Sequence, residues 1–181
     1  MSDLKLVGIS GALRKDSTNT KFVTEAARLF GAAEFTLGDI RFPLYDGDLE
    51  SAEGVPLVVQ TLADQIAAAD AIIVSTPEYN KSIPGVLKNA FDWVSRVEGN
   101  PWAGKPVAII SAAAGRSGGE RAQVSTREAL VYSQPLFVIG PEIGLAQSFN
   151  QFDEAGKLTN EITVENLQVL MDKLRAEALR A

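Results

Sequence analysis

The chain has 181 residues, of which 46% are hydrophobic and 22% are charged, and its formal net charge is −6. We expect one domain spanning residues 1–181, large enough to bury its own core without a metal or a disulfide. The absence of cysteine and histidine excludes thiol catalysis, cysteine or histidine metal sites and Ser-His-Asp triads. The pI near 4.8 argues against nucleic acid or an anionic membrane as a partner. The N-terminal apolar run is too short for a signal peptide or membrane span, so we expect a cytoplasmic protein.

Apolar runs alternate with helical stripes along the chain. Strands are predicted at residues 4–10, 34–37, 70–77, 106–114 and 135–140, with further apolar residues near Leu145. Helices are predicted at residues 20–30, 58–66, 84–95, 119–133 and 164–179. Residues 41–56 are predicted to be a loop. Val58 is expected to face the core, whereas Trp93 lies off the inward stripe of its helix and is expected to be exposed.

This β-α alternation, repeated five times, predicts an α/β fold of three layers: a five-stranded parallel sheet with helices on both faces. Five strands favour the flavodoxin-like order 2-1-3-4-5. In such sheets, ligands bind at the carboxyl ends of the strands near the point where the strand order reverses. Three unusual loops are expected there, at residues 11–19, 77–83 and 112–119.

The first loop combines hydroxyl, amide and guanidinium donors at the start of a helix. These donors are Ser10, Arg14, Ser17, Thr18, Asn19 and Thr20. Together with free backbone N–H groups they suit a terminal phosphate monoester. The alternative is a plain helix cap by Asp16, Ser17 or Asn19. Because a carboxylate would repel a phosphate, the phosphate hypothesis requires Asp16 to point outward.

The second and third loops suit a planar ligand. Pro77 and Pro84 stiffen the second, "TPEYNKSIPG", so that its backbone groups are held ready for a heterocycle. The third, "SAAAGRSGGERAQ", has small residues that let a ligand approach the main chain. Ordinary turns are the alternative for both loops, and Tyr79 is equally suited to be a half-buried packing aromatic.

Four segments, "SGALRKDSTNTKF", "PLYDGD", "TPEYNKSIPGVLKNAFDWVSR" and "GKPVAIISAAAGRSGGERAQ", resemble the NADPH-dependent FMN reductase family of flavodoxin-like proteins, especially its bacterial quinone and chromate reductase branch. The resemblance covers nearly the whole chain and weakens after about Pro141. The chain departs from the family at Asp16, where a small residue is usual.

The resemblance implies a non-covalently bound FMN. Its phosphate would be held by Ser10, Arg14, Ser17, Asn19 and Thr20. Its isoalloxazine ring would lie along Pro77, Glu78, Tyr79 and Asn80, and be bounded by Ser111 and Gly115. The resemblance also implies a homodimer or homotetramer, with Tyr45, Asp46, Asp92 and Trp93 contributing across the interface.

The activity that the resemblance implies is NAD(P)H-dependent and ping-pong. Hydride passes from NADPH or NADH to FMN, then electrons pass to quinones, azo or nitro compounds, free flavin or chromate. No catalytic side chain is assigned. The alternatives are a flavodoxin-like single-electron carrier, a phosphate-ligand sensor or structural module, and an FAD-dependent quinone reductase.

Overall fold

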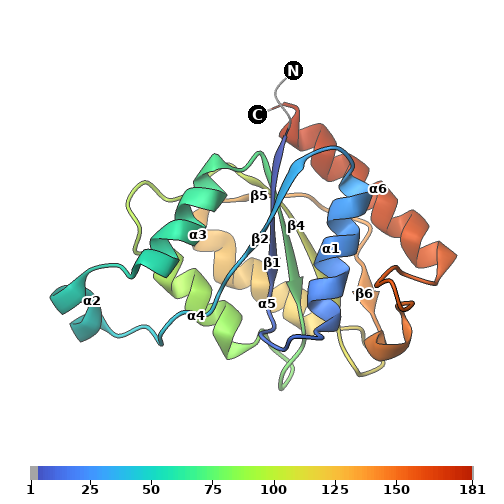
Figure 1. Cartoon of the computed structure of the whole chain (residues 1–181), viewed down its shortest axis with the longest axis horizontal. Coiled ribbons are helices and arrows are strands. Elements are labelled where there is room, and N and C mark those ends of the chain that lie inside the picture. Colours follow the sequence, from blue (N-terminus) through green and yellow to red (C-terminus); the bar gives the residue numbers. More distant parts are fainter. Residues whose placement is uncertain (1–3, 181) are drawn as a thin grey trace.

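Six parallel strands form one sheet in the computed structural model, which describes residues 4–180 (Figure 1). Five of them are ordered β2-β1-β3-β4-β5, which confirms the predicted order. Their bounds are β1 Lys5–Ser10, β2 Glu34–Gly38, β3 Ala71–Thr76, β4 Pro106–Ala112 and β5 Leu136–Phe137. The sixth strand, β6 (Gly144–Leu145), also pairs with β4.

The strand predicted at residues 135–140 is present but shorter, at Leu136–Phe137, and a further short strand follows it at Gly144–Leu145. Leu136 of β5 is paired with the beginning of β4, and Gly144 of β6 is paired with its end. Pro141 lies between the two strands and has no N–H group to donate to a ladder. The sheet therefore has six strands instead of the predicted five.

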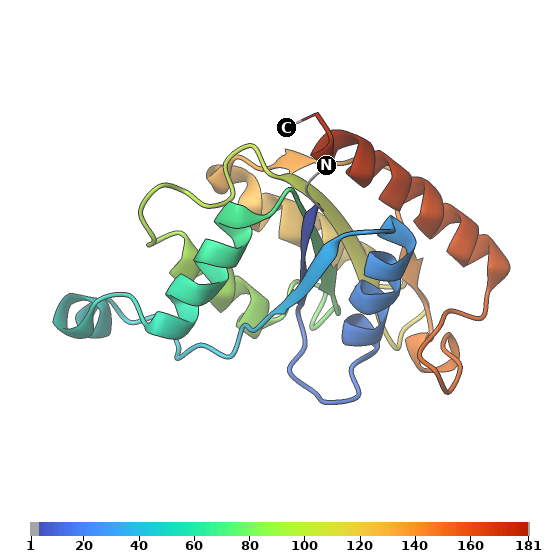
Figure 2. The same ribbon diagram turned by 45° about the horizontal axis from the view of Figure 1, so that its top comes forward.

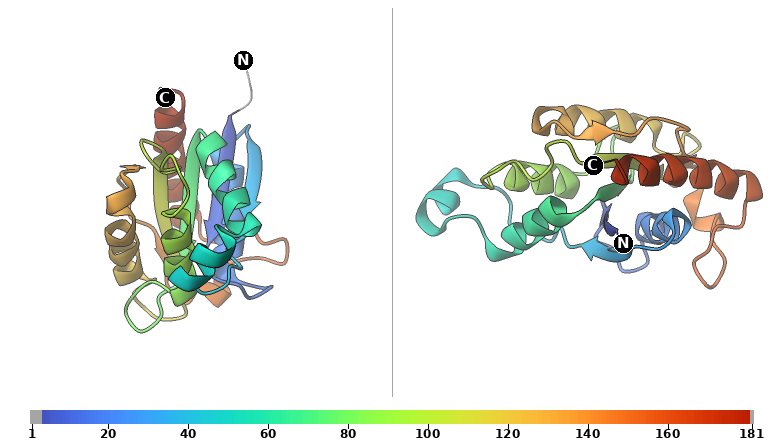
Figure 3. Two further views of the ribbon diagram at one scale, coloured as in Figure 1. Left: turned by 90° about the vertical axis from the view of Figure 1, so that its left-hand side faces the viewer. Right: turned by 90° about the horizontal axis from the view of Figure 1, so that it is seen from above.

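Helices cover both faces of the sheet and make three layers (Figures 1 and 3). One face is covered by α1 (Thr18–Phe30) and α6 (Glu161–Ala178). The other is covered by α3 (Leu57–Ala68), α4 (Gly85–Val94) and α5 (Glu120–Leu130), which is followed by a 3-10 turn at Val131–Ser133. A second 3-10 turn is Ser148–Asn150. Every residue of β3 and β4 is buried, because apolar side chains pack on both faces.

The helix predictions are confirmed to within a few residues at their ends, but one inward residue is wrong. Val58 is 52% exposed, whereas Val59, one residue further along, is fully buried. Within residues 4–180, none of the helices combines the length and the apolar character needed to cross a membrane.

Helix α2 (Gly47–Glu53) lies in the segment that we expected to be a loop. Asp46 caps its N-terminus by accepting a hydrogen bond from the N–H group of Asp48. None of its residues is buried, and it projects from the body of the molecule in Figures 1 and 2. A helix without a buried face has no apolar stripe, which is why the sequence pattern did not indicate it.

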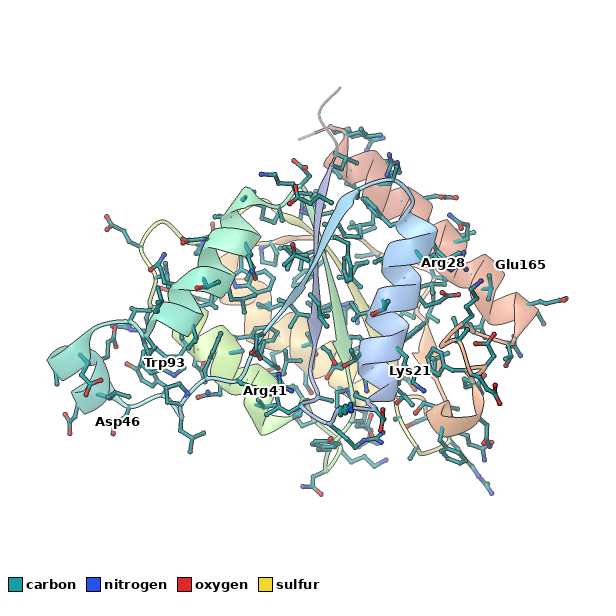
Figure 4. All side chains as sticks on the ribbon, viewed as in Figure 1. Lys21, Arg28, Arg41, Asp46, Trp93 and Glu165 are labelled. Carbon is teal, nitrogen blue, oxygen red and sulfur yellow. The ribbon has the colours of Figure 1, made fainter. Side chains whose placement is uncertain are left out.

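The prediction of an exposed Trp93 is wrong, because the segment before α2 covers the outer side of α4 (Figure 4). The indole Nε1 donates a hydrogen bond to the Pro43 carbonyl at 2.8 Å. The ring of Tyr45 packs edge-to-face on the indole, with ring centroids 5.0 Å apart. The Trp93 side chain, with no exposed surface, is closed to a second subunit and cannot serve the interface role expected for it.

Candidate functional site

A cavity of about 1000 Å³ lies at the carboxyl ends of β1, β3 and β4, the lower edge of the sheet in Figure 1. All three loops selected from the sequence line it, as the strand order predicts. The lining residues are Ala12, Arg14, Ser17, Thr18, Asn19, Pro77, Glu78, Tyr79, Asn80, Lys81, Ala112, Ala113, Ala114, Gly115, Arg116, Ser117, Ser148 and Phe149.

The first loop ends in a capped helix that faces this cavity. Ser17 is the N-cap of α1, and its hydroxyl accepts a hydrogen bond from the N–H group of Asn19 at 3.2 Å. The cap considered as the alternative for this loop is thus present, on a residue that also lines the cavity. Arg14 is exposed at the cavity wall. Asp16 is exposed and is not part of that wall, as the phosphate hypothesis requires.

Asn19 lines the cavity but also joins three elements of the fold. Its Nδ2 donates to the Ala112 carbonyl at 2.8 Å. Its Oδ1 accepts from the Ser75 hydroxyl at 2.9 Å and from the Ala112 N–H group at 3.1 Å. These bonds fasten the start of α1 to β3 and β4, so the side chain fixes the position of the helix N-terminus at the cavity.

Three predicted site residues do not line the cavity: Ser10, Thr20 and Ser111. Thr20 Oγ1 donates to Ser10 Oγ at 2.9 Å, and this pair lines a second, smaller cavity. The Ser111 hydroxyl is buried; it donates to the Gly118 carbonyl at 2.7 Å and accepts from the Gln123 amide. The other eight, which the fold brings together, are Arg14, Ser17, Asn19, Pro77, Glu78, Tyr79, Asn80 and Gly115. An FMN-binding role for each of the eleven stays a prediction.

The loop after β3 is held tightly by its own backbone. Tyr79 and Ser82 exchange two N–H···O=C bonds, each 3.0 Å long. Between them, Asn80 and Lys81 have φ values of +52° and +67°, as in a type I′ turn. Asn adopts a positive φ readily, but Lys seldom does, so the turn stores backbone strain at Lys81, which is typical of functional loops.

Glu78 ties this loop to the start of α5. Its side chain is only 7% exposed. Oε2 accepts a hydrogen bond from the Arg121 N–H group at 3.1 Å, and Oε1 lies 3.4 Å from Lys81 Nζ. A carboxylate near a helix N-terminus is stabilised by the free N–H groups there.

The loop after β4 forms a wall of small residues. Residues 112–115 are three alanines and a glycine. Beyond them, Gly118 has a φ of +64°, and a Cβ added there would lie 2.6 Å from the backbone of Gly144. Small side chains on this wall let a planar molecule approach the main chain closely.

Sequence reasoning did not assign site roles to several residues of the wall. These are Ala12, Lys81, Ala112, Ala113, Ala114, Arg116, Ser117, Ser148 and Phe149. Ser148 lies beyond the weak last strand and reaches the cavity because its hydroxyl is hydrogen-bonded to that of Thr18 at 2.9 Å. No sequence signal relates two residues 130 positions apart. The loops at 11–19, 77–83 and 112–119 already indicated the other residues except Phe149.

The donors of the cavity fit a phosphate-bearing planar cofactor. A guanidinium, hydroxyl groups and a helix N-terminus gather at the first loop and suit a phosphate. The wall of residues 112–115 and the stiff turn after β3 suit an aromatic ring system, and the cavity volume lies within the range of ligand sites. The fold and this site define a flavodoxin-like α/β protein with a flavin-type ligand site.

Comparisons with known proteins agree with this class. Residues 4–150 match the family model described as NADPH-dependent FMN reductase. An NAD(P)H-dependent FMN reductase of Pseudomonas aeruginosa is 42% identical over 96% of this chain and 94% of its own. A quinone reductase of Escherichia coli is 38% identical over 91% of this chain and 89% of its own. The solved structure of FerB, a flavoenzyme NAD(P)H:(acceptor) oxidoreductase from Paracoccus denitrificans, superposes with a TM-score of 0.87 at 34% identity, covering 98% of each chain.

The chain therefore belongs to the NADPH-dependent FMN reductase family. It is an oxidoreductase that uses FMN and NAD(P)H, and this confirms the family, cofactors and enzyme class inferred from its motifs. The relatives support this function over the single-electron carrier.

Proposed function

We propose that this enzyme uses NAD(P)H to reduce FMN in the large cavity and then transfers the electrons to quinones. Azo and nitro compounds, free flavin and chromate are further acceptors that we propose for it. The main observation behind this proposal is that phosphate donors and a wall of small residues line the same cavity. The chain also has no histidine or cysteine that could perform the redox chemistry instead. Its volume of about 1000 Å³ is at the upper end for a single small-molecule site, which leaves room for a second molecule beside a cofactor.

Two groups of cavity residues would bind different parts of FMN, one the phosphate and the other the ring. The Arg14 guanidinium and the donors around Ser17 would hold the phosphate, and Thr18, also in the wall, adds a hydroxyl. Residues 77–80 and Gly115 would border the ring. When bound, FMN supplies the hydride chemistry that no side chain of this protein offers.

The turn after β3 would contribute backbone donors to the ring. The N–H groups of Tyr79 and Ser82 are already bonded to each other's carbonyls, and Pro77 has none. The donors left to stabilise negative charge on a reduced ring are those of Glu78, Asn80 and Lys81. The strained turn holds these N–H groups in place, so they would stabilise negative charge on the ring without having to rearrange.

We propose that the chain, acting as one domain over residues 1–181, assembles as a homodimer or homotetramer in the cytoplasm. The supporting feature is a set of exposed apolar side chains on α5 and the 3-10 turn that follows it: Val124 is 58% exposed, Val131 63% and Tyr132 85%. Dependence on NAD(P)H supports the cytoplasm as the location. Light scattering of the eluted protein measures the assembly, and a mass of one chain would contradict this part of the proposal.

An absorption spectrum tests the main proposal. We expect purified protein mixed with FMN to keep the flavin bound through gel filtration. Anaerobic NADPH or NADH should then bleach the flavin absorbance, and 1,4-benzoquinone should restore it without any partner protein. A protein that does not retain FMN contradicts the cofactor site, whereas one that retains it but needs a protein partner for turnover is a carrier.

A further inference from the structure

Phe149 is a large apolar side chain that is left in contact with water at the large cavity. It lines the cavity and is 65% exposed. Tyr79, on the loop after β3, is a second aromatic residue of the same wall. Covering an exposed phenyl ring with a ligand is favourable, because apolar surface is then removed from water. The function proposed above gives Phe149 no role.

The segment that carries Phe149 is fastened to the loop after β4. It is a 3-10 turn beyond β6, at the edge of the sheet beside the start of α1 (Figure 1). Just before the turn, the N–H group of Gln147 donates to the Gly115 carbonyl at 3.1 Å. The N–H group of Ser148 donates to the Ala113 carbonyl at 3.0 Å. The backbone that carries the phenyl ring is therefore fixed at the cavity before any ligand binds.

A cation lies on the adjoining stretch of the same wall. Arg116 lines the cavity and directly follows Gly115, the residue whose carbonyl accepts the hydrogen bond from Gln147. Arg116 is exposed, and within residues 4–180 its guanidinium takes part in no ion pair. A positive charge and an apolar ring are thus carried by two backbone segments that are bonded to each other.

Arg116 is also the cation that the cavity has left for a second molecule. In the described part of the chain three cations line the cavity, and two of them are engaged. Lys81 Nζ lies 3.4 Å from the buried carboxylate of Glu78, and Arg14 is the residue that we propose for the FMN phosphate. Gly115, the neighbour of Arg116, belongs to the group proposed to border the ring. A molecule that binds Arg116 would therefore lie near the ring, where electrons are transferred.

We propose that Arg116 and Phe149 bind the electron acceptor and favour aromatic acceptors that carry an acidic group, such as a sulfonate or a carboxylate. The phenyl ring packs against the aromatic ring of the acceptor, and the guanidinium donates hydrogen bonds to its anionic group. Overall, a quinone, NAD(P)H and a proton give a hydroquinone and NAD(P)⁺, and neither side chain gains or loses a proton. The inference rests on the proposed function, because it assumes that the acceptor enters the cavity that holds FMN.

Steady-state kinetics with two matched acceptors test the proposal. 1,2-Naphthoquinone-4-sulfonate carries an anionic group, and 1,2-naphthoquinone has the same rings without it. Arg116→Gln should lower kcat/KM about tenfold for the sulfonate and less than about twofold for the neutral quinone, as expected for losing one charge-assisted hydrogen bond. Phe149→Ala should lower kcat/KM about fivefold for both, because the rings are common to them, and Phe149→Leu should lower it less.

Arg121→Gln is the matched control for the charge. The Arg121 side chain is exposed, lies outside the cavity wall and, within residues 4–180, forms no ion pair. Its removal takes away one positive charge five positions from Arg116 and should leave the ratio of the two acceptors unchanged. A general loss of attraction for anions would lower the ratio in both variants.

Calorimetric titration gives a readout independent of turnover. Naphthalene-2-sulfonate and naphthalene-2-sulfonamide have nearly the same shape and differ in charge. We expect the sulfonate to bind the FMN-loaded protein about tenfold more tightly than the sulfonamide, and Arg116→Gln to remove the difference. Phe149→Ala should weaken the binding of both.

Three results overturn the inference. The first is equal binding of the two naphthalenes to the parent, or an acceptor ratio that falls no further in Arg116→Gln than in Arg121→Gln. The second is unchanged binding of both naphthalenes by Phe149→Ala. The third is an Arg116→Gln variant that loses FMN or has a lower kcat/KM for NADPH, since the cation then serves the cofactor or the donor. If the parent binds FMN but oxidises no donor, the proposed function fails, while the titration still reports on Arg116 and Phe149.

Discussion

The loops after β3 and β4 both line the cavity, and they are built in opposite ways. The loop after β3 is rigid because polar groups fix it: a reciprocal backbone pair between Tyr79 and Ser82, and the buried carboxylate of Glu78. The loop after β4 forms a flat surface because residues 112–115 carry no side chain larger than a methyl group. A flat ligand needs both walls, one with fixed donors and one that allows close approach.

Gly118→Ala should break the small-residue wall and gives the largest expected effect. A Cβ at this position meets the Gly144 backbone at 2.6 Å, and φ is positive, so the free energy of unfolding should fall by about 3 kcal/mol. The control is Gly85→Ala beyond the β3 loop, where an added Cβ has no atom within 4 Å. Urea denaturation of both variants measures the difference, and equal midpoints would refute this explanation.

Arg14→Ala tests whether the first loop closes the site between the two walls. Each charge-assisted hydrogen bond contributes roughly 1.5–3 kcal/mol, so the variant should bind FMN about 10- to 100-fold more weakly. Quenching of flavin fluorescence gives the Kd. Arg14→Lys keeps the charge but not the fork of donors, so its affinity for FMN should lie between those of the parent and Arg14→Ala. If Arg14→Ala binds FMN as tightly as the parent, Arg14 does not hold the phosphate.

Glu78→Gln tests the link between the walls. The amide keeps an acceptor for the Arg121 N–H group but loses the charge that favours the helix N-terminus and Lys81. The expected loss is about 1 kcal/mol in the free energy of unfolding. Glu128→Gln, on the exposed side of α5, should change it less than about 0.5 kcal/mol. Similar losses in both variants would mean that the Glu78 contacts stabilise nothing.

Glu50, on the projecting helix α2, provides a reference away from both walls and the smallest expected effect. Hydrogen bonds from Arg96 and Tyr45 lower the pKa of its carboxyl. The hydrogen bond between Tyr45 and Glu50 also raises the pKa of the Tyr45 hydroxyl. A lowered folded-state pKa gives stability that is present above the unfolded value, about 4.3, and is lost as pH falls through the folded value. The parent should therefore be more stable than Glu50→Gln at pH 7, and the gap should close on acidification. Urea midpoints at several pH values check this, and a gap that is constant with pH would contradict it.

The sequence predicted the fold better than the facing of individual side chains. The alternation of apolar runs and stripes gave the strand order and located the three loops, since each pattern reflects local burial. It failed at Trp93 because residues 43–45, far away in the chain, cover the outer side of α4. It also made the last strand too long and missed the short strand β6 after it, because an apolar run alone could not reveal that the chain pairs with β4 at two places.

The site divides in the same way. Donor-rich and glycine-rich loops were recognisable from composition, and the strand order required them to meet. Only the folded chain determined that the hydroxyls of Ser10 and Thr20 face a second cavity, that Ser111 bonds within the loop after β4, and that Ser148 reaches the first cavity. Sequence periodicity records which side of an element is buried. The direction of a hydroxyl depends on partners that the chain brings together from distant positions, and only the tertiary structure supplies those.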